Sequence, residues 1–137
     1  MRLAQDKMEK AKELAYRGKT LEEVQAMDTR EFAKLLKSRA RRTVLRQFNV
    51  IENFVKESKK KIENGKEIRT HSRDLVIVPQ MVGMKIGIYN GKEFLAITIV
   101  KEMLGHRLGE FSLTRKKVEH GAAGIGATKS SASRSVK

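Results

Sequence analysis

The sequence predicts an α+β protein in which a small, mostly antiparallel three-stranded sheet packs with helices, extended by a helical N-terminal region and a basic, flexible C-terminal tail. In the first half of the 137-residue chain, apolar residues recur at helical spacing among paired charges. The second half holds eight of the ten glycines, between Gly83 and Gly126, and its apolar residues are mainly β-branched, which favours strands. This length fits one compact domain with extensions.

The N-terminal region, residues 1–66, is expected to be helical. Apolar residues from Leu3 to Ala15 recur every three to four positions, and this first helix is expected to end at Gly18. Three capping boxes then predict helices that begin near Leu21, Thr29 and Val50, because each pairs an acceptor side chain with a glutamate three residues later. These boxes are Thr20 with Glu23, Asp28 with Glu31, and Asn49 with Glu52. The last helix is expected to end at Asn64-Gly65.

Residues 67–114 are expected to form the α+β core. The continuous apolar run Leu75–Val78, closed by the only proline, predicts a short buried strand. The segments Met84–Tyr89 and Glu93–Val100 flank Asn90-Gly91, which predicts a hairpin with a type I′ turn, a turn that needs positive φ at both central residues.

The remaining chain is less regular. Residues 101–108 are expected to form one or two helical turns, broken by Gly105 and Gly109. Residues 115–137 form the tail: beyond Phe111 there are six basic residues against Glu119 alone, with few apolar anchors. Such a segment is expected to become ordered only on a partner.

The net charge of +14 indicates a polyanionic partner, because a chain this short otherwise repels itself strongly. No apolar run approaches the roughly 18 residues of a membrane-spanning helix, and no signal-peptide pattern opens the sequence, so a soluble intracellular protein is expected. The absence of cysteine excludes disulfides, thiol catalysis and cysteine-based zinc sites. The three histidines have no metal-ligand spacing, and no cofactor is expected.

Arginines between Arg39 and Arg46 lie on adjacent helical turns, where planar guanidinium groups suit phosphate oxygens. A solvated helix face is the alternative, although few acidic residues stand nearby. A second basic cluster is the lysine-rich helix end from Lys56 to Lys61. The aromatic residues show no regular interleaving, which favours recognition of RNA shape and phosphates over the reading of unpaired bases. No helix-turn-helix or zinc-finger pattern supports readout of duplex DNA.

Two segments offer weak signals for other chemistry. Residues 70–74 contain a histidine, a serine and an aspartate, but neighbours along an extended segment alternate in direction and cannot form a catalytic relay. The glycines from Gly121 to Gly126 lack the spacing, and the flanking strand and helix, of a nucleotide-binding loop. His106 is equally compatible with RNA contact and with a structural role. No catalytic residue is therefore expected.

The segment from Asn90 to Thr114 carries a specific motif. Asn90-Gly91-Lys92 is followed by Ile99, then by Leu104-Gly105, and then by Leu108-Gly109-Glu110-Phe111-Ser112-Leu113-Thr114. This pattern resembles the signature of the small-subunit ribosomal protein S19 family. The match extends through residues 70–74, 78–83 and 124–131 and covers roughly residues 20–137, and the helical N-terminal region and Gly-Ile-Gly-Ala-Thr tail resemble the archaeal and eukaryotic branch.

The resemblance implies a structural protein in the head of the small ribosomal subunit, bound to the 3′ major domain of the ribosomal RNA in the cytoplasm. It also implies ribosomal protein S13 as a neighbour, and a tail, residues 120–137, that reaches toward transfer RNA in the A site. RNA contacts are implied for residues 71–73, 90–92, 106–107 and 114–115. With the basic clusters, the expected RNA-binding set is Arg39, Arg41, Arg42, Arg46, Lys59, Lys60, Lys61, His71, Ser72, Arg73, Lys85, Asn90, Gly91, Lys92, His106, Arg107, Thr114, Arg115, Lys116, Lys117, His120 and Lys129.

Two other classes of protein share some of these features. A chromatin-type DNA-binding protein has the same charge but should prefer duplex DNA. An RNA-processing enzyme would need a metal or an acid-base site, whereas the carboxylates here mostly stand in capping boxes or beside lysines.

Overall fold

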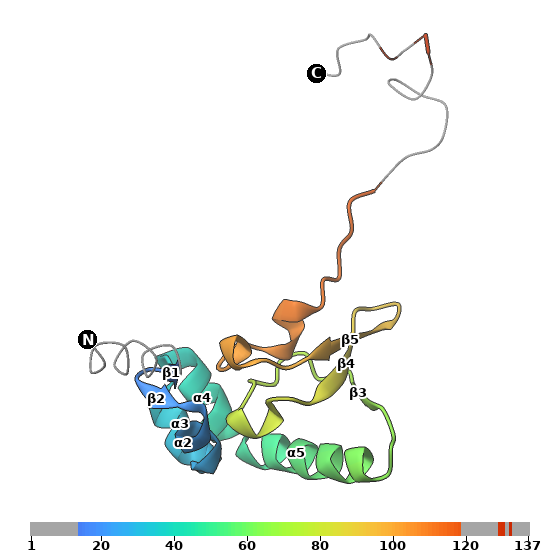
Figure 1. The fold of residues 1–137 in the computed structure, drawn as a ribbon. Coiled ribbons are helices and arrows are strands. Elements are labelled where there is room, and N and C mark those ends of the chain that lie inside the picture. The colour runs from blue at the N-terminus through green and yellow to red at the C-terminus, as the bar shows by residue number, and fades with distance from the viewer. Residues whose placement is uncertain (1–13, 119–128, 131, 133–137) are drawn as a thin grey trace, which may run out of the picture.

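The computed structural model describes residues 14–118, 129–130 and 132 and has an α+β fold (Figure 1). Its helices are α2 (Leu21–Ala26), α3 (Thr29–Leu35), α4 (Ser38–Arg46) and α5 (Phe48–Glu63). Its strands are β1 (Leu14–Tyr16), β2 (Lys19–Thr20), β3 (Ile68–Thr70), β4 (Lys85–Tyr89) and β5 (Phe94–Thr98). Three 3-10 turns are η1 (Pro79–Met81), η2 (Lys101–Met103) and η3 (Leu108–Phe111). The predicted fold class is confirmed.

The helices begin close to the predicted positions, but their caps differ. The capping box at Thr20 is complete, since its hydroxyl accepts from the Glu23 N–H at 3.3 Å and the Glu23 carboxylate accepts from the Thr20 N–H at 3.1 Å. Asp28 precedes α3 but makes no side-chain cap. The box predicted at Asn49 is wrong, because α5 already begins at Phe48. The end of α5 at Asn64-Gly65 is confirmed, and Gly65 has a φ of 64°.

The end of the predicted first helix is wrong. Leu14–Tyr16 form β1, which pairs antiparallel with β2, and the earlier part of this helix lies outside the described residues. Arg17 and Gly18 connect the strands with φ values of 47° and 83°. Positive φ at both positions suits a tight hairpin turn, so Gly18 closes a hairpin and does not end a helix.

The three-stranded sheet has the order β3-β4-β5 and is mixed. β4 and β5 are antiparallel over five residue pairs, whereas β3 runs parallel to β4 over three, so antiparallel pairing predominates in the mixed sheet. β3 was not predicted. The predicted strand at 75–78 is buried but is no strand: Val76 makes a single bridge with Arg107, and the Ile77 N–H donates to the His106 carbonyl at 2.8 Å. This crossover segment lies in the core without joining the sheet.

The hairpin between β4 and β5 is confirmed, but the type I′ turn is wrong. Tyr89 pairs with Phe94, so residues 90–93 form a four-residue loop. Gly91 has a φ of 102°, whereas Asn90 does not have positive φ. The Asn90 side-chain oxygen instead accepts from the N–H groups of Lys92 and Glu93, both at 2.9 Å. An asparagine side chain thus shapes the loop by replacing a backbone acceptor.

The core is one continuous cluster that includes both helical and sheet residues, among them Val24, Phe32, Ile51, Ile86 and Leu108. It therefore extends across residue 66, and the division of the chain at that position stays a prediction. The helical turns expected after residue 100 form as η2 and η3. Gly105, with a φ of 80°, separates them, whereas Gly109 lies inside η3.

Candidate nucleic-acid interface

Three exposed arginines on one face of α4 form the clearest cationic surface. Arg39, Arg42 and Arg46 are spaced by three and four residues, which places them on neighbouring turns of the same face. Together with Ser38, Arg41 and Leu45 they line a shallow hollow. No hydrogen bond or ion pair joins their guanidinium groups to another residue of the described part of the chain. As far as the described residues go, each of these guanidinium groups can donate to a phosphate oxygen.

Arg41, on the same helix, is already engaged. Its guanidinium donates to the carbonyls of Ala33 at 3.3 Å, Lys34 at 3.0 Å and Leu36 at 3.2 Å. The last carbonyls of a helix have no partner within the helix, so this side chain satisfies the C-terminal end of α3. Arg41 therefore mainly stabilises the fold.

Arg73 has a similar structural role at the centre of the molecule. The half-buried guanidinium donates to the carbonyl of Tyr89 at the end of β4, to that of Gly109 at 2.9 Å, and to that of Ser112, where the C-terminal segment begins. Gly109 also donates its N–H to the Arg73 carbonyl at 2.8 Å. These contacts join the hairpin to the start of the C-terminal segment.

His106 and Arg107 meet the helical region at a second hollow of about 500 Å³, which is also lined by Arg17, Lys37 and Arg39. The Arg107 guanidinium donates to the Thr43 hydroxyl on α4 at 3.3 Å. The hollow therefore brings together cationic residues that are distant in the sequence, and it adds Arg17 and Lys37, which the sequence did not single out.

Glu110 organises the backbone of this cluster. Its carboxylate accepts from the Arg107 N–H at 3.2 Å and lies 2.7 Å from the His106 ring nitrogen Nδ1. Partial burial raises the pKa of Glu110, but the hydrogen bonds from Arg107 and His106 and the charges of both residues lower it more. The net effect is a lowered pKa, so the carboxylate favours its ionised form.

The other expected RNA-binding residues are distributed over several surfaces. Lys59 and Lys60 are exposed near the end of α5, and Lys61 is half-buried there. Figure 1 shows α5 on the side of the molecule opposite the departing C-terminal segment, so these lysines form a separate patch. The exposed remainder comprises His71, Ser72, Lys85, Gly91, Lys92, Thr114, Arg115, Lys116, Lys117 and Lys129, and Asn90 is half-buried. His120 lies outside the described residues.

The polar segment at residues 70–74 does not assemble as a catalytic relay. The His71 ring contacts Tyr89, with 4.6 Å between ring centroids, and Phe94, at 5.0 Å. The Asp74 carboxylate instead accepts from the Gln47 amide at 2.7 Å. Within the described ranges no three histidine or acidic side chains gather as a metal site, and no helix is long and apolar enough to cross a membrane.

The aromatic cluster of His71, Tyr89 and Phe94 was missed by sequence reasoning. Its three rings come from the end of β3, the end of β4 and the start of β5. Tyr89 and Phe94 flank the predicted hairpin loop. Pairing the two strands in the correct register would have predicted their contact, because directly opposed residues lie on the same face of a sheet. The histidine could not be placed, since β3 itself was not predicted.

These features define a class: a small basic α+β protein with a compact core and many exposed cationic side chains in its described part, as in proteins that bind a nucleic acid. Comparison with known proteins gives the family. Residues 40–120 match the family model described as Ribosomal protein S19. The chain is also 47% identical over 124 residues, covering 88% of this chain and 89% of the relative, to small ribosomal subunit protein uS19 of Saccharolobus solfataricus.

The chain therefore belongs to the ribosomal protein S19 family, in its archaeal and eukaryotic form, which confirms the resemblance inferred from the motif at Asn90–Thr114. Its role is structural and its location is the ribosome, because the family comprises structural, non-enzymatic ribosomal proteins. Ribosomal RNA and the ribosome are the partners that membership of this family implies.

Proposed function

We propose that this protein binds small-subunit ribosomal RNA in the 3′ major domain, in the head of the subunit, through cations held around its core. The observation that carries the proposal is the set of arginines on α4, Arg39, Arg42 and Arg46, which have no partner among the described residues and lie beside the hollow at His106 and Arg107. The full set of expected RNA-binding residues belongs to this proposal, with Arg41 and Arg73 acting mainly by holding segments in place.

The proposed mechanism is scaffolding. Guanidinium groups bind phosphates as planar forks, and a rigid helix holds several of them at fixed spacing. Phosphate contacts carry no sequence information by themselves, so recognition depends on whether the folded RNA presents phosphates at a matching spacing. The resemblance described above supports the remaining parts of the proposal: a cytoplasmic ribosome, S13 as a neighbour, and a tail directed at A-site transfer RNA.

Titration of the full chain with a transcript of the 3′ major domain tests RNA binding. The logarithm of the affinity should fall linearly with the logarithm of salt, by roughly 0.7 to 0.9 for each phosphate neutralised. Arg42→Gln should reduce this slope by about one such increment without changing stability, because its side chain has no described partner in the fold. A slope near zero for the wild-type chain contradicts the proposal.

Two controls separate this function from the chromatin-type alternative. In competition, structured ribosomal RNA should displace the protein from duplex DNA, and the reverse result would favour the alternative. In cells, the chain should co-sediment with small ribosomal subunits after a high-salt wash.

A photo-crosslinker at the exposed Lys129 should label A-site transfer RNA if the tail has the proposed direction.

A further inference from the structure

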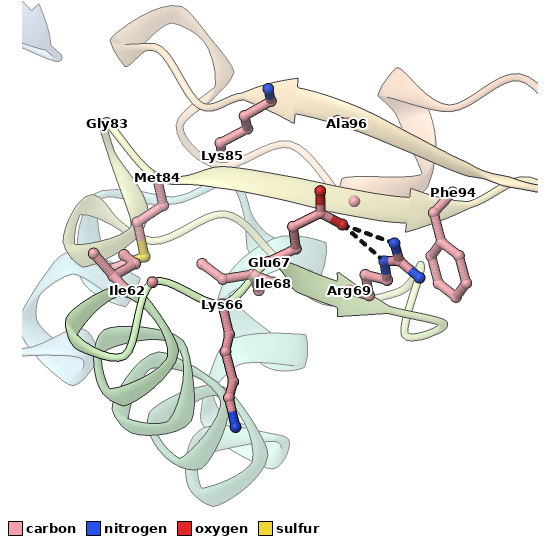
Figure 2. A pocket seen from close by; sticks show the side chains of 12 residues that line it. Ile62, Lys66, Glu67, Ile68, Arg69, Gly83, Met84, Lys85, Phe94 and Ala96 are labelled. Atoms are coloured by element: carbon pink, nitrogen blue, oxygen red, sulfur yellow. Dashed lines mark hydrogen bonds and ion pairs between the residues drawn. The ribbon is translucent and has the colours of Figure 1, made fainter.

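The β3-β4-β5 sheet has one face that packs into the core and one that points away from it. On β4, Ile86 and Ile88 are fully buried in the core, so the alternating residues Lys85, Gly87 and Tyr89 face outward. Beside this face, the end of α5 and the chain leading into β3 enclose a hollow of about 600 Å³ (Figure 2). Ligand pockets commonly measure about 300 to 1,000 Å³, so the hollow is large enough for one nucleotide.

Small side chains form part of the lining of the hollow. Gly87 and Ala96 are directly opposed across β4 and β5, and both contribute to it. Gly87 is buried: a Cβ there would lie 3.3 Å from the Ile68 carbonyl oxygen and 3.5 Å from both Arg69 Cγ and Phe94 Cβ, so the glycine lets these two side chains pack closely over the strand. The apolar residues Ile62, Met84 and Phe94 complete much of the lining. A flat ring could therefore rest against Ala96 and the side chains of Arg69 and Phe94 that cover Gly87.

One side of the hollow carries a cluster of flat groups that meet at tilted or edge-to-face angles. The Arg69 guanidinium carbon lies 5.5 Å from the centroid of the Phe94 ring, and Phe94 contacts Tyr89 and His71 at 5.1 and 5.0 Å. Glu67 accepts from the guanidinium through Nε at 3.1 Å and Nη2 at 2.8 Å, which fixes its plane. Figure 2 shows this pair beside the Phe94 ring.

The charge around the hollow favours an anion. Three cationic side chains, Lys66, Arg69 and Lys85, line it against the single carboxylate of Glu67, which already pairs with Arg69. Lys66 and Lys85 extend from opposite rims in Figure 2, where either could meet a phosphate on the strand entering or leaving the hollow. A flat apolar centre with cationic rims is the complement of a nucleotide.

We propose that this hollow, the sheet-face hollow, binds one unpaired nucleotide of the ribosomal RNA, with its base stacked against Arg69 and Phe94. This inference rests on the proposed function and deepens it, because phosphate and shape recognition alone would need no such site. Aromatic rings and guanidinium planes on an open sheet are the groups on which proteins stack bases that have left an RNA helix. A neutral or basic peptide would gain nothing from the cationic rims.

Filling the hollow is the first test. Ala96 is exposed on β5, so Ala96→Leu adds bulk inside the hollow without removing a charge or a core contact. Thr98→Leu is the matched control, because Thr98 is exposed on the same face of the same strand but does not line the hollow. Ala96→Leu should weaken binding to the 3′ major domain transcript by roughly ten- to one-hundred-fold, the range for one stacked base, and Thr98→Leu should not.

Removing the ring is the second test. Phe94→Leu should weaken binding by a similar factor but leave the salt slope unchanged, since a stacked base releases no counterions. Phe48→Leu is the control, because Phe48 is also half-buried with an arginine, Arg30, 4.3 Å above its ring, yet it lies outside the hollow. The urea midpoint of each variant shows whether it is folded. Ultraviolet crosslinking of the wild-type complex should join a nucleotide to a peptide within residues 66–96.

The outcomes separate this proposal from the one on which it rests. If the wild-type chain shows no salt-dependent RNA binding, the proposed function fails. If it binds but Ala96→Leu and Phe94→Leu bind equally well, the sheet-face hollow is not a nucleotide site and the proposed function stands. If the variants bind RNA normally but fail to enter small subunits, the hollow takes a protein neighbour, and the inference is overturned.

Discussion

Gly105 is required both by its backbone conformation and by packing. Its φ is 80°, which side chains rarely allow, and an added Cβ would lie 2.9 Å from Cδ2 of Leu36 and 3.1 Å from the hydroxyl oxygen of Tyr16. Gly91 has a similarly positive φ of 102° but open space around it. Substitutions at the two positions therefore distinguish backbone strain, which is expected at both, from steric overlap, which is expected only at Gly105.

Gly105→Ala is expected to destabilise the protein by about 2 to 4 kcal/mol, because strain and overpacking add. Gly91→Val should cost roughly 1 to 3 kcal/mol from backbone strain alone. The urea midpoint measures both changes in the free energy of unfolding when the dependence of that free energy on urea concentration stays the same. An unchanged midpoint for Gly91→Val would contradict the hairpin loop, and an unchanged midpoint for Gly105→Ala would contradict the packing of Tyr16 and Leu36 over it.

Glu110 should make stability depend on pH in acid. Its pKa in the folded protein is lowered from the ordinary value of 4.5, so the ionised carboxylate stabilises the fold above that pH. The stabilisation should disappear as the pH falls through the lower folded value. Glu110→Gln removes this dependence, and comparing urea midpoints of both proteins from about pH 6 to about pH 3 measures it. Identical pH profiles would show that the carboxylate contributes nothing.

At the level of elements, Arg41 links α3 to α4 and Arg42 does not. Arg41→Met should leave the carbonyls of Lys34 and Leu36 without the guanidinium donor, while the Ala33 carbonyl keeps the Leu36 N–H at 3.1 Å, and it should destabilise the protein by about 2 kcal/mol. Its RNA salt slope should stay close to that of the wild type, the opposite of the result expected for Arg42→Gln. A stable Arg41→Met protein with a reduced slope would make Arg41 a phosphate ligand.

Elements fixed by neighbouring residues could be predicted from the sequence. The capping box at Thr20, the end of α5 at Gly65, and the existence of the hairpin all depend on contacts within a few residues. β3 has three residues and its partner β4 lies beyond a long crossover, so no local pattern identifies it. The apolar run at 75–78 predicts a strand. The run is apolar because it is buried in the core, however, and not because it pairs within a sheet.

The candidate site shows the same limit. The sequence located the cationic residues, but it could not separate free guanidiniums from those bound to the fold. Arg73 reaches carbonyls 36 and 39 residues further along the chain, at Gly109 and Ser112, and such contacts exist only after folding. The rings of His71, Tyr89 and Phe94 beside the sheet-face hollow likewise come from distant parts of the chain: β4, β5 and the residue after β3. The cationic character of the site could therefore be predicted from residue types, whereas the positions and partners of the side chains could not.

At the scale of the whole molecule, Arg73 joins three separate segments. Arg73→Lys keeps the charge but loses the fork that reaches the carbonyls of Tyr89, Gly109 and Ser112, so it should cost about 2 to 4 kcal/mol. Arg115→Lys, on the exposed segment beyond, is the control and should be neutral. Urea unfolding measures both. Equal stability of the two variants would mean that these contacts do not hold the segments together.

The crossover between β3 and β4 ties the helices and the sheet into a single mechanical unit. Its residues Leu75–Val78 belong to the same apolar cluster as the helices, while its backbone bonds to the segment at 105–108. Neither the helices nor the sheet can detach from the other without exposing the crossover residues Leu75–Val78 to water. Melting should therefore be all-or-none, and loss of native structure at any one part of this core should disrupt all the surfaces proposed to bind RNA at the same time.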